Sequence, residues 1–254
     1  SRPHPLSIEA AVTSLKRYLT EPRYRIQLSD LIDEAVDRAD EATSGTAFVT
    51  EGGPQPTTES ATARVRSYEA ACSTLLAMAP IGGFWAEDEH VYIWQRALGR
   101  LSAARSGRGY VLWIGLQRYP GTLLLYALGL GAIEAARLKP LGRLFATTVQ
   151  TEGRDGLRAV QLLPPFSLFE NGGRVAKILA GMEQRRAPLN DWLHEVLRQP
   201  MRRLIPNDDR YTYVFDKLEM LMALGYAHHA KRPKDRYWAP LGAFGYRDQN
   251  RDRF

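Results

Sequence analysis

Histidine and carboxylate side chains, which bind metals and transfer protons in many enzymes, come together at three places in the sequence. Glu87–His90 places three acids before a histidine, but acids there also stabilise the first turn of a helix. His194 lacks a second histidine four residues further on, so the zinc-protease spacing is absent. His228 and His229 are adjacent and would face opposite sides of a strand. We therefore predict no metal site and interpret Glu87–His90 as a helix start.

Cysteine and glycine patterns also lack the context that nucleophilic or phosphate-binding chemistry needs. Cys72 is the single cysteine, and it falls on the apolar side of an expected helix, where a thiol is a small buried hydrophobe. Gly129 and Gly131 lie in an apolar helix, and residues 171–173 (Asn-Gly-Gly) are not followed by the Lys-Ser/Thr of a phosphate loop. No Gly-x-Ser-x-Gly sequence occurs. We predict that the chain is not an enzyme and binds no cofactor.

Charge is unevenly distributed along the chain. The formal net charge is +6, from 34 Lys/Arg and 28 Asp/Glu. Residues 1–100 contain 10 basic and 14 acidic residues (−4), which leaves 24 and 14 (+10) in residues 101–254. This division is compatible with nucleic acid or another polyanion near the second half. The alternative, which we favour because the basic residues are scattered, is an arginine-rich surface without an anion site.

A candidate anion site follows the last predicted helix. Lys231, Arg232, Lys234 and Arg236, with Trp238 beside them, have the outline of a winged-helix end. In that interpretation the cations contact phosphates and Trp238 stacks on a base. The alternative is a solvated hairpin turn with Trp238 packed on the helix. We favour the alternative because no helix with Arg, Asn or Gln on its outer face precedes the turn.

Apolar residues recur at helical spacing along most of the chain, which predicts a mainly α fold. We expect a multi-helix domain of helical hairpins with a small C-terminal β-hairpin. The expected divisions are an N-terminal helical pair in 1–45, a flexible linker rich in Thr, Gly and Pro in 46–58, a helical core in 59–205, a helix plus β-hairpin module in 206–247, and a tail in 248–254.

Proline and glycine set the expected helix ends in the first half of the chain. Ser7 is predicted to cap the first helix and Pro22 to end it. The second helix exposes a row of acids, which we interpret as a solvated face. The third helix begins at about Glu59 and is expected to stop at the residues Pro80–Gly83, before a fourth helix that follows Glu87–His90.

The centre of the chain is expected to form a helical hairpin. A helix from Tyr119 to about Leu138 carries Gly129 and Gly131, small residues that allow a neighbouring helix to approach closely. Pro140 ends this helix and begins its partner, which reaches Thr148. The segment before it, Tyr110–Gln117, fits a helix or a strand equally.

Shorter elements are predicted near the C-terminus. A helix is expected at about Val175–Gln184, and another at Leu189–Leu197, capped by Asn190 and ending before Pro200. The residues 207–209 (Asn-Asp-Asp) cap a stronger helix over Arg210–Leu224. The strands of the C-terminal hairpin are predicted at Tyr226–Ala230 and Arg236–Ala239.

Three segments carry a resemblance to a known group of proteins. They are Arg118–Ala127 (Arg-Tyr-Pro-Gly-Thr-Leu-Leu-Leu-Tyr-Ala), Phe215–Leu224 (Phe-Asp-Lys-Leu-Glu-Met-Leu-Met-Ala-Leu) and Tyr237–Arg247. They resemble the C-terminal helical regions of multidomain bacterial, often actinobacterial, phage-defence proteins with sirtuin-type or Schlafen-like N-terminal modules. The resemblance covers about residues 110–247 and lies in the hydrophobic pattern, so it assigns no functional residues. It implies an accessory role.

These observations favour a non-catalytic accessory domain that senses a trigger, binds a protein partner or self-associates in the bacterial cytoplasm. The first residues, Ser-Arg-Pro, indicate an excised fragment, and Ser1–Ser7 lacks the apolar core of a signal peptide. No membrane partner is expected. The alternative is a nucleic-acid-binding domain that uses Lys231–Arg236. A small-molecule enzyme is the third interpretation, which a cleft gathering polar side chains from distant segments would support.

Overall fold

The described part of the chain is mainly helical and contains one small antiparallel sheet, which confirms the predicted fold class. No helix within it has the length and apolar content needed to cross a bilayer. The computed structural model describes residues 7–85, 87–103, 107–151, 154–169, 174–230 and 239–247.

Five helices make up the first part of the fold, and most of the buried residues of α1, α2, α3 and α5 recur at helical spacing. The Ser7 hydroxyl accepts a hydrogen bond from the Ala10 N–H and so caps α1, as predicted. Two short 3₁₀ turns, η1 and η2, connect some of these helices. The bounds are α1 Ile8–Leu19, η1 Pro22–Tyr24, α2 Arg25–Ala42, η2 Thr46–Phe48, α3 Thr58–Ala71, α4 Ser73–Trp85 and α5 Val91–Leu101.

The second part of the fold alternates long helices with short elements. Its bounds are α6 Val111–Leu116, α7 Tyr119–Glu134, α8 Leu138–Phe145, β1 Thr148–Thr151, β2 Arg154–Arg158, α9 Ala159–Leu162, α10 Pro165–Leu168, η3 Arg174–Ile178, α11 Pro188–Met201, α12 Asp208–His229 and α13 Phe244–Arg247. The predicted helix Tyr119–Leu138 and its partner are therefore present as α7 and α8, and Tyr110–Gln117 is helical rather than extended.

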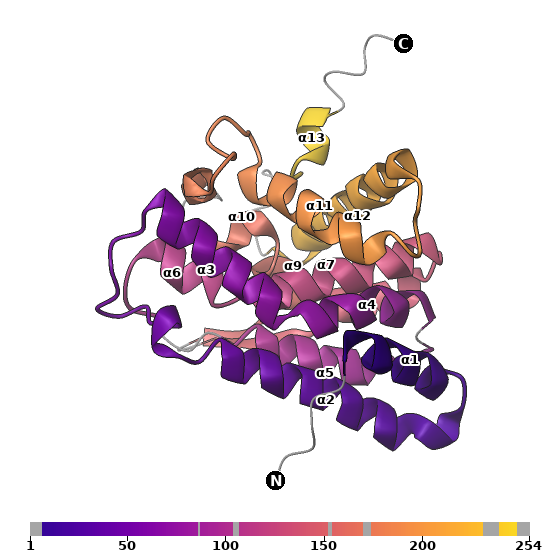
Figure 1. Cartoon of the computed structure of the whole chain (residues 1–254). Coiled ribbons are helices and arrows are strands. Elements are labelled where there is room, and N and C mark those ends of the chain that lie inside the picture. Colours follow the sequence, from indigo (N-terminus) through magenta and orange to yellow (C-terminus); the bar gives the residue numbers. More distant parts are fainter. Residues whose placement is uncertain are drawn as a thin grey trace.

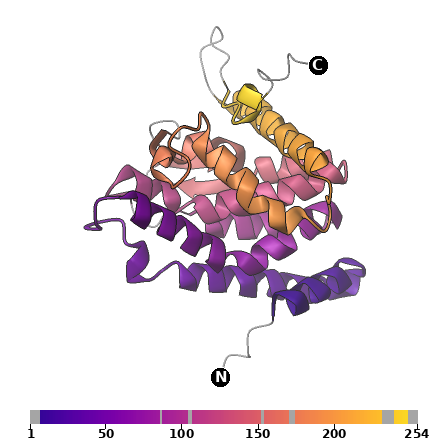
Figure 2. The same ribbon diagram turned by 45° about the horizontal axis from the view of Figure 1, so that its top comes forward.

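Helix α7 lies at the centre of the molecule (Figure 1), and every residue in it except Glu134 is buried. It packs against α4, α5, α8, α11 and α12. The helices α1 and α2 lie on one side of this centre, and α11 and α12 lie on the opposite side, as Figure 2 shows. A helix that is apolar on all sides is stable only when neighbours cover it completely, so α7 organises the whole core.

The predicted stop at Pro80–Gly83 is wrong, because α4 continues through these residues to Trp85. A proline inside a helix removes one backbone hydrogen bond, and glycines lower helix propensity. Here the same residues are buried, Pro80 and Gly83 against α7 and Gly82 against Trp94 of α5. The contact between α4 and α7 is the most extensive helix contact of the described chain. Burial of this segment outweighs its poor intrinsic propensity. The prediction that small residues in α7 allow close approach is confirmed by this contact.

Two predicted boundaries around the central hairpin are also wrong. Helix α7 ends at Glu134 instead of Leu138, because Ala136 adopts a left-handed φ of 56° and the Arg137 N–H returns to the Ala132 carbonyl at 2.7 Å. The partner helix α8 begins before Pro140, which occupies its first turn, where a missing N–H costs little.

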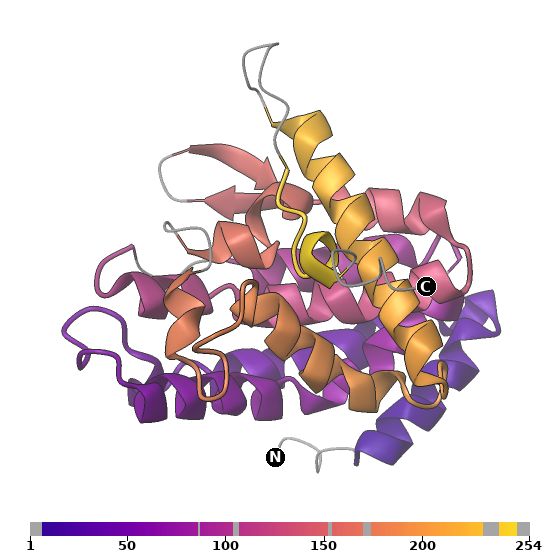
Figure 3. The same cartoon turned by 90° about the horizontal axis from the view of Figure 1, so that it is seen from above.

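The β-hairpin lies earlier in the chain than predicted. Strands β1 and β2 pair antiparallel, with Thr148 opposite Arg158 and Val149 opposite Leu157. The strand predicted for Tyr226–Ala230 is wrong, since α12 continues to His229. Figure 3 shows this end of α12 and the hairpin at the same edge of the molecule. Ala239 belongs to no strand, and the rest of the second predicted strand lies outside the described residues.

Three predictions near α11 need correction. The helix expected at Val175–Gln184 is reduced to the turn η3, followed by irregular backbone. Helix α11 continues past Leu197 and includes Pro200. Asn190 does not cap this helix. It lies within the first turn, and its buried side chain is bonded to Glu219. The cap predicted for α12 is confirmed, because the Asn207 side chain accepts from the Arg210 N–H at 2.7 Å.

Candidate functional site

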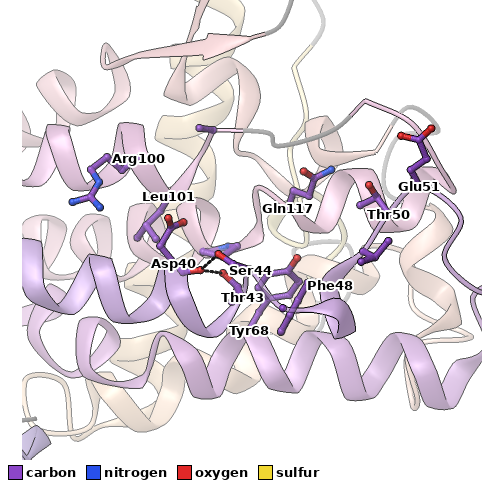
Figure 4. A pocket seen from close by; sticks show the side chains of 14 residues that line it. Asp40, Thr43, Ser44, Phe48, Thr50, Glu51, Tyr68, Arg100, Leu101 and Gln117 are labelled. Carbon is purple, nitrogen blue, oxygen red and sulfur yellow. Dashed lines mark hydrogen bonds between the residues drawn. The ribbon is translucent and has the colours of Figure 1, made fainter.

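A pocket of about 270 Å³ opens beside the C-terminal end of α2 (Figure 4). Residues 40–51, at the end of α2 and in the segment after it, form one wall. The remaining wall comes from Tyr68 in α3, from residues 100–103 at the end of α5, and from Gln117 and Pro120 at the junction of α6 and α7. We call this cavity the α2 pocket. It brings together segments that lie up to about 80 positions apart in the sequence.

Local hydrogen bonds shape the turn that leads from α2 into the pocket wall. The Thr43 hydroxyl donates to the Ala39 carbonyl at 2.8 Å, and the Ser44 hydroxyl donates to the Asp40 carbonyl at 2.5 Å. The Thr43 N–H also donates to Ala39. These bonds satisfy carbonyls that a helix end leaves without partners. They turn the chain so that the residues after Ser44 face α3 and α5.

Aromatic rings and a close backbone contact complete the inner wall. The rings of Phe48 and Tyr68 meet edge to face, with centroids 4.7 Å apart. Gly109 has a φ of +120°, and a Cβ there would lie 2.2 Å from the Thr50 carbonyl oxygen. Only glycine allows this approach between the 107–110 turn and the pocket wall.

The segment 46–58, expected to be a flexible linker, makes specific contacts beyond the pocket. Arg64 donates to the Val49 carbonyl at 3.2 Å, and its guanidinium stacks 3.8 Å from the centroid of the Trp113 ring. The Trp113 indole N–H donates to the Pro54 carbonyl at 2.8 Å. These contacts attach the segment to α3 and α6.

The described charged residues of the α2 pocket lining are two acids, Asp40 and Glu51, and one base, Arg100. Asp40 lies in the last turn of α2, and Glu51 lies at the opposite end of the pocket from Arg100 (Figure 4). Arg100 pairs with Asp37 at 2.5 Å, outside the pocket lining. Glu51 pairs with Arg108 at 3.4 Å, but the two side chains are 62% and 81% exposed, so water screens this pair strongly.

Glu69, a carboxylate of α3 whose side chain is 10% exposed, joins three helices. Its Oε1 accepts from the Tyr119 hydroxyl at 2.9 Å and from the Trp192 indole N–H at 2.6 Å. Arg66 pairs with its other oxygen at 2.9 Å. Burial, reinforced by the Glu69 charge, raises the pKa of Tyr119 well above its usual value, so the phenol stays neutral. This cluster stabilises the packing of α3, α7 and α11.

Glu219, a fully buried carboxylate, holds the C-terminal segment on α12. It is 2% exposed and accepts from the Asn190 amide at 2.6 Å and from the Phe244 N–H at 3.0 Å. Gly242 has a φ of +63°, and a Cβ there would lie 2.7 Å from Oε1 of Glu219. Burial, with the Glu219 charge next in size, raises the pKa of Tyr126 well above its usual value. Only a very small cavity remains beside Glu219 and its partners, so their role is structural: they attach the C-terminal segment to α12.

The residue clusters singled out in the sequence do not meet. Glu87–His90 precedes α5, and the His90 Nδ1 accepts from the Glu87 N–H at 3.2 Å, while burial lowers the pKa of His90. Asp88 pairs with Lys139 of α8. His194 packs against the rings of Tyr211 and Phe215 in the core. No three metal-ligating side chains come together in the part of the chain that the structure describes.

Cys72 and the histidine pair do not line the α2 pocket. Burial raises the pKa of Cys72 to about 12, so the thiol is protonated and inert at neutral pH. His228 and His229 are consecutive residues of α12, with ring centroids 4.9 Å apart. Burial, followed by the charges of His228 and Arg158, lowers the pKa of His229.

The predicted nucleic-acid contacts cannot be located in the fold. Lys231, Arg232, Lys234, Arg236 and Trp238 all lie outside the described residues. Conversely, no motif in the sequence pointed to the α2 pocket. Its lining residues form no motif, and the Thr, Gly and Pro content of residues 46–58 suggested a linker. The acidic end of α2, without a basic residue in its last turn, was the one signal available.

Comparison with known proteins adds no relative to this description. No protein-family model, no curated protein and no solved structure matches the chain. The fold class is therefore defined by the helices themselves, and the candidate site by the geometry of the α2 pocket.

Proposed function

We propose that this chain is a non-catalytic recognition domain that senses a ligand in the α2 pocket. The main support is the pocket itself, which collects carboxylates, hydroxyls, an amide and aromatic rings from distant segments. No histidine or cysteine lies among its described lining residues. The Ser44 hydroxyl donates to a backbone carbonyl, which does not activate a nucleophile. These features suit binding better than turnover.

The proposal extends to an accessory role in a larger bacterial defence-type protein. The support for this part is the resemblance of residues 110–247 to the helical regions of such proteins. Contact with a protein partner or a second copy belongs to the same role. Tyr213, Met220 and Leu224, which are exposed along α12, are the candidate contact residues.

Thermal unfolding in the presence of small compounds tests ligand sensing. The compounds are grouped as organic cations, carboxylates, phosphates and neutral polar molecules. We expect at least one group to raise the melting temperature in a concentration-dependent way, because a ligand that binds only the folded state stabilises it. The variant Ala103→Trp places a large side chain at the pocket wall and should abolish the response.

The matched control for this experiment is Ala47→Trp, the same change at an exposed residue outside the pocket lining. It should respond as the unaltered chain does. Failure of every compound group to change the melting temperature would contradict the proposal. An equal response in Ala103→Trp would contradict it as well.

Nucleic-acid binding is the second candidate function. It is supported by the net charge of +10 in residues 101–254, obtained above as 24 minus 14. Arg158 and His229 also lie close together at the C-terminal end of α12, immediately before Lys231. Clustered Lys and Arg side chains are the usual phosphate contacts of nucleic-acid-binding surfaces, and Arg158 would add to the cations of Lys231–Arg236.

A salt titration of binding to generic DNA and RNA distinguishes this candidate. If it is correct, the logarithm of the binding constant falls linearly with the logarithm of salt concentration, with a slope of about −0.9 per phosphate contacted on double-stranded DNA. Replacing Lys231, Arg232, Lys234 and Arg236 together by glutamine should reduce that slope. Absence of binding at low salt excludes the candidate.

A further inference from the structure

Arg118, at the junction of α6 and α7, carries a partly buried guanidinium without a counter-charge. Within the part of the chain that the structure describes, this guanidinium makes no hydrogen bond, ion pair or ring contact. Its Nε is fully enclosed and has no acceptor. The terminal nitrogens are not enclosed in this way, so they remain reachable from solvent. Burial lowers the pKa of Arg118, and no neighbouring charge acts in the opposite direction.

An unpaired arginine is costly in such a place because its charge cannot be removed. The guanidinium stays protonated throughout the physiological pH range, unlike a lysine or histidine that becomes neutral on burial. Buried charges in folded proteins are therefore paired or hydrogen-bonded. A charge without a partner destabilises the folded chain. An anion that joined Arg118 would remove this cost.

Arg64 shows how the same fold satisfies an arginine that burial affects in the same way. Burial also lowers the pKa of Arg64. Its guanidinium nevertheless donates to the Val49 carbonyl at 3.2 Å and stacks 3.8 Å from the centroid of the Trp113 ring. The difference between Arg64 and Arg118 is therefore the presence of partners within the described chain.

The neighbours of Arg118 in space are neutral. Gly115, three positions earlier, approaches the Leu168 carbonyl oxygen so closely that a Cβ would lie 2.4 Å from it. Thr122, four positions later, donates to the Leu163 carbonyl at 2.8 Å. Arg118 thus lies beside the α9–α10 segment, and residues 159–169 contain no Asp or Glu. This segment supplies carbonyl and apolar groups but no negative charge.

We infer that Arg118 is the anchor of a second binding site, which takes a small oxyanion, a carboxylate or phosphate group, at its terminal nitrogens. The parallel N–H groups of a guanidinium match two oxygens of such a group, so the contact is bidentate and charge-assisted. The site is separate from the α2 pocket, because Gln117 and Pro120 line that pocket and Arg118 does not. The inference therefore does not depend on the proposed ligand sensing.

Thermal unfolding in chloride buffer tests whether Arg118 is unpaired. The variant Arg118→Met removes the charge and keeps an unbranched side chain. We expect its melting temperature to be higher than that of the unaltered chain by about 2 °C or more, because an uncompensated buried charge is lost. The matched control is Arg64→Met, which loses the Val49 hydrogen bond and the Trp113 stacking. Its melting temperature should fall.

A nuclear magnetic resonance titration tests the oxyanion directly in the unaltered chain. The Nε–H signal of Arg118 is assigned by its absence in Arg118→Lys, since lysine has no such group. Phosphate and acetate should each be compared with chloride at equal ionic strength. We expect at least one of the two to shift the signal saturably, with half-saturation at a concentration at least tenfold below that of chloride. The tighter ion identifies the phosphate or carboxylate class. The Nε–H signal of Arg64 should not shift.

Three results would overturn the inference. A melting temperature of Arg118→Met no higher than that of the unaltered chain would show that an acid of the chain itself pairs with Arg118. Absence of a saturable shift with both phosphate and acetate would exclude the oxyanion. An equal shift of the Arg64 signal would show a general salt effect and no site at Arg118.

Discussion

Replacing Gly131 by alanine is expected to lower the free energy of unfolding by about 3 kcal/mol or more, the upper part of the range for overpacked cores. A Cβ at this position would lie 2.1 Å from the Pro80 carbonyl oxygen. The obstructing atom is backbone, in the buried part of α4, so it cannot rotate away. The extra methyl group must push α4 and α7 apart, although alanine is the better helix former.

Urea denaturation measures this effect, and Gly99→Ala is the matched control. Gly99 also lies within a helix, α5, but a Cβ there meets nothing within 4 Å. Gly99→Ala should therefore raise the free energy of unfolding by up to about 1 kcal/mol, the helix-propensity difference alone. A Gly131→Ala variant as stable as the unaltered chain would show that α4 and α7 do not approach as closely as described.

The second large effect is expected from Glu219→Ala, which should lower the free energy of unfolding by about 3 kcal/mol. The substitution leaves the Asn190 amide and the Phe244 N–H without their shared acceptor in a buried site. Because Phe244 belongs to the segment that Glu219 holds, hydrogen exchange at the Phe244 amide should accelerate more than exchange in α7.

The control for Glu219→Ala is Glu195→Ala, in which an exposed acid of α11 is removed. Glu195 lies 3.9 Å from Arg185, and its side chain is 57% exposed, so its loss should change stability by less than about 0.5 kcal/mol. If the two variants lose equal stability, or if exchange at Phe244 does not change in Glu219→Ala, the pinning role of Glu219 is wrong.

The outcome of the sequence predictions depends on how local the controlling interactions are. Ser7 and Asn207 cap helices through bonds to residues three positions away, so a short stretch of sequence was sufficient to predict them. Pro80 and Pro200 were expected to end helices, but both lie inside them. In α4, burial against α7 stabilises the helix despite its proline. No local sequence pattern indicates that burial.

Side chains with two plausible roles show the same limit. Asn190 has the composition of a cap, but its amide bonds to Glu219, 29 positions away. The sequence Tyr226–His229 is compatible with a strand, yet it extends a helix whose earlier turns are already packed on α7 and α11. In both cases tertiary contacts overrode a local preference.

The amino-acid sequence by itself determined that the chain is mainly helical, that a small-residue helix forms its centre, and where several helices begin. These properties follow from apolar periodicity and from caps, which act within one or two turns. Only the tertiary structure decided the position of the β-hairpin, the contacts of Glu69 and Glu219, and the α2 pocket. The carboxylate contacts and the α2 pocket join residues far apart in the chain, and such contacts are determined by which helix faces bury one another.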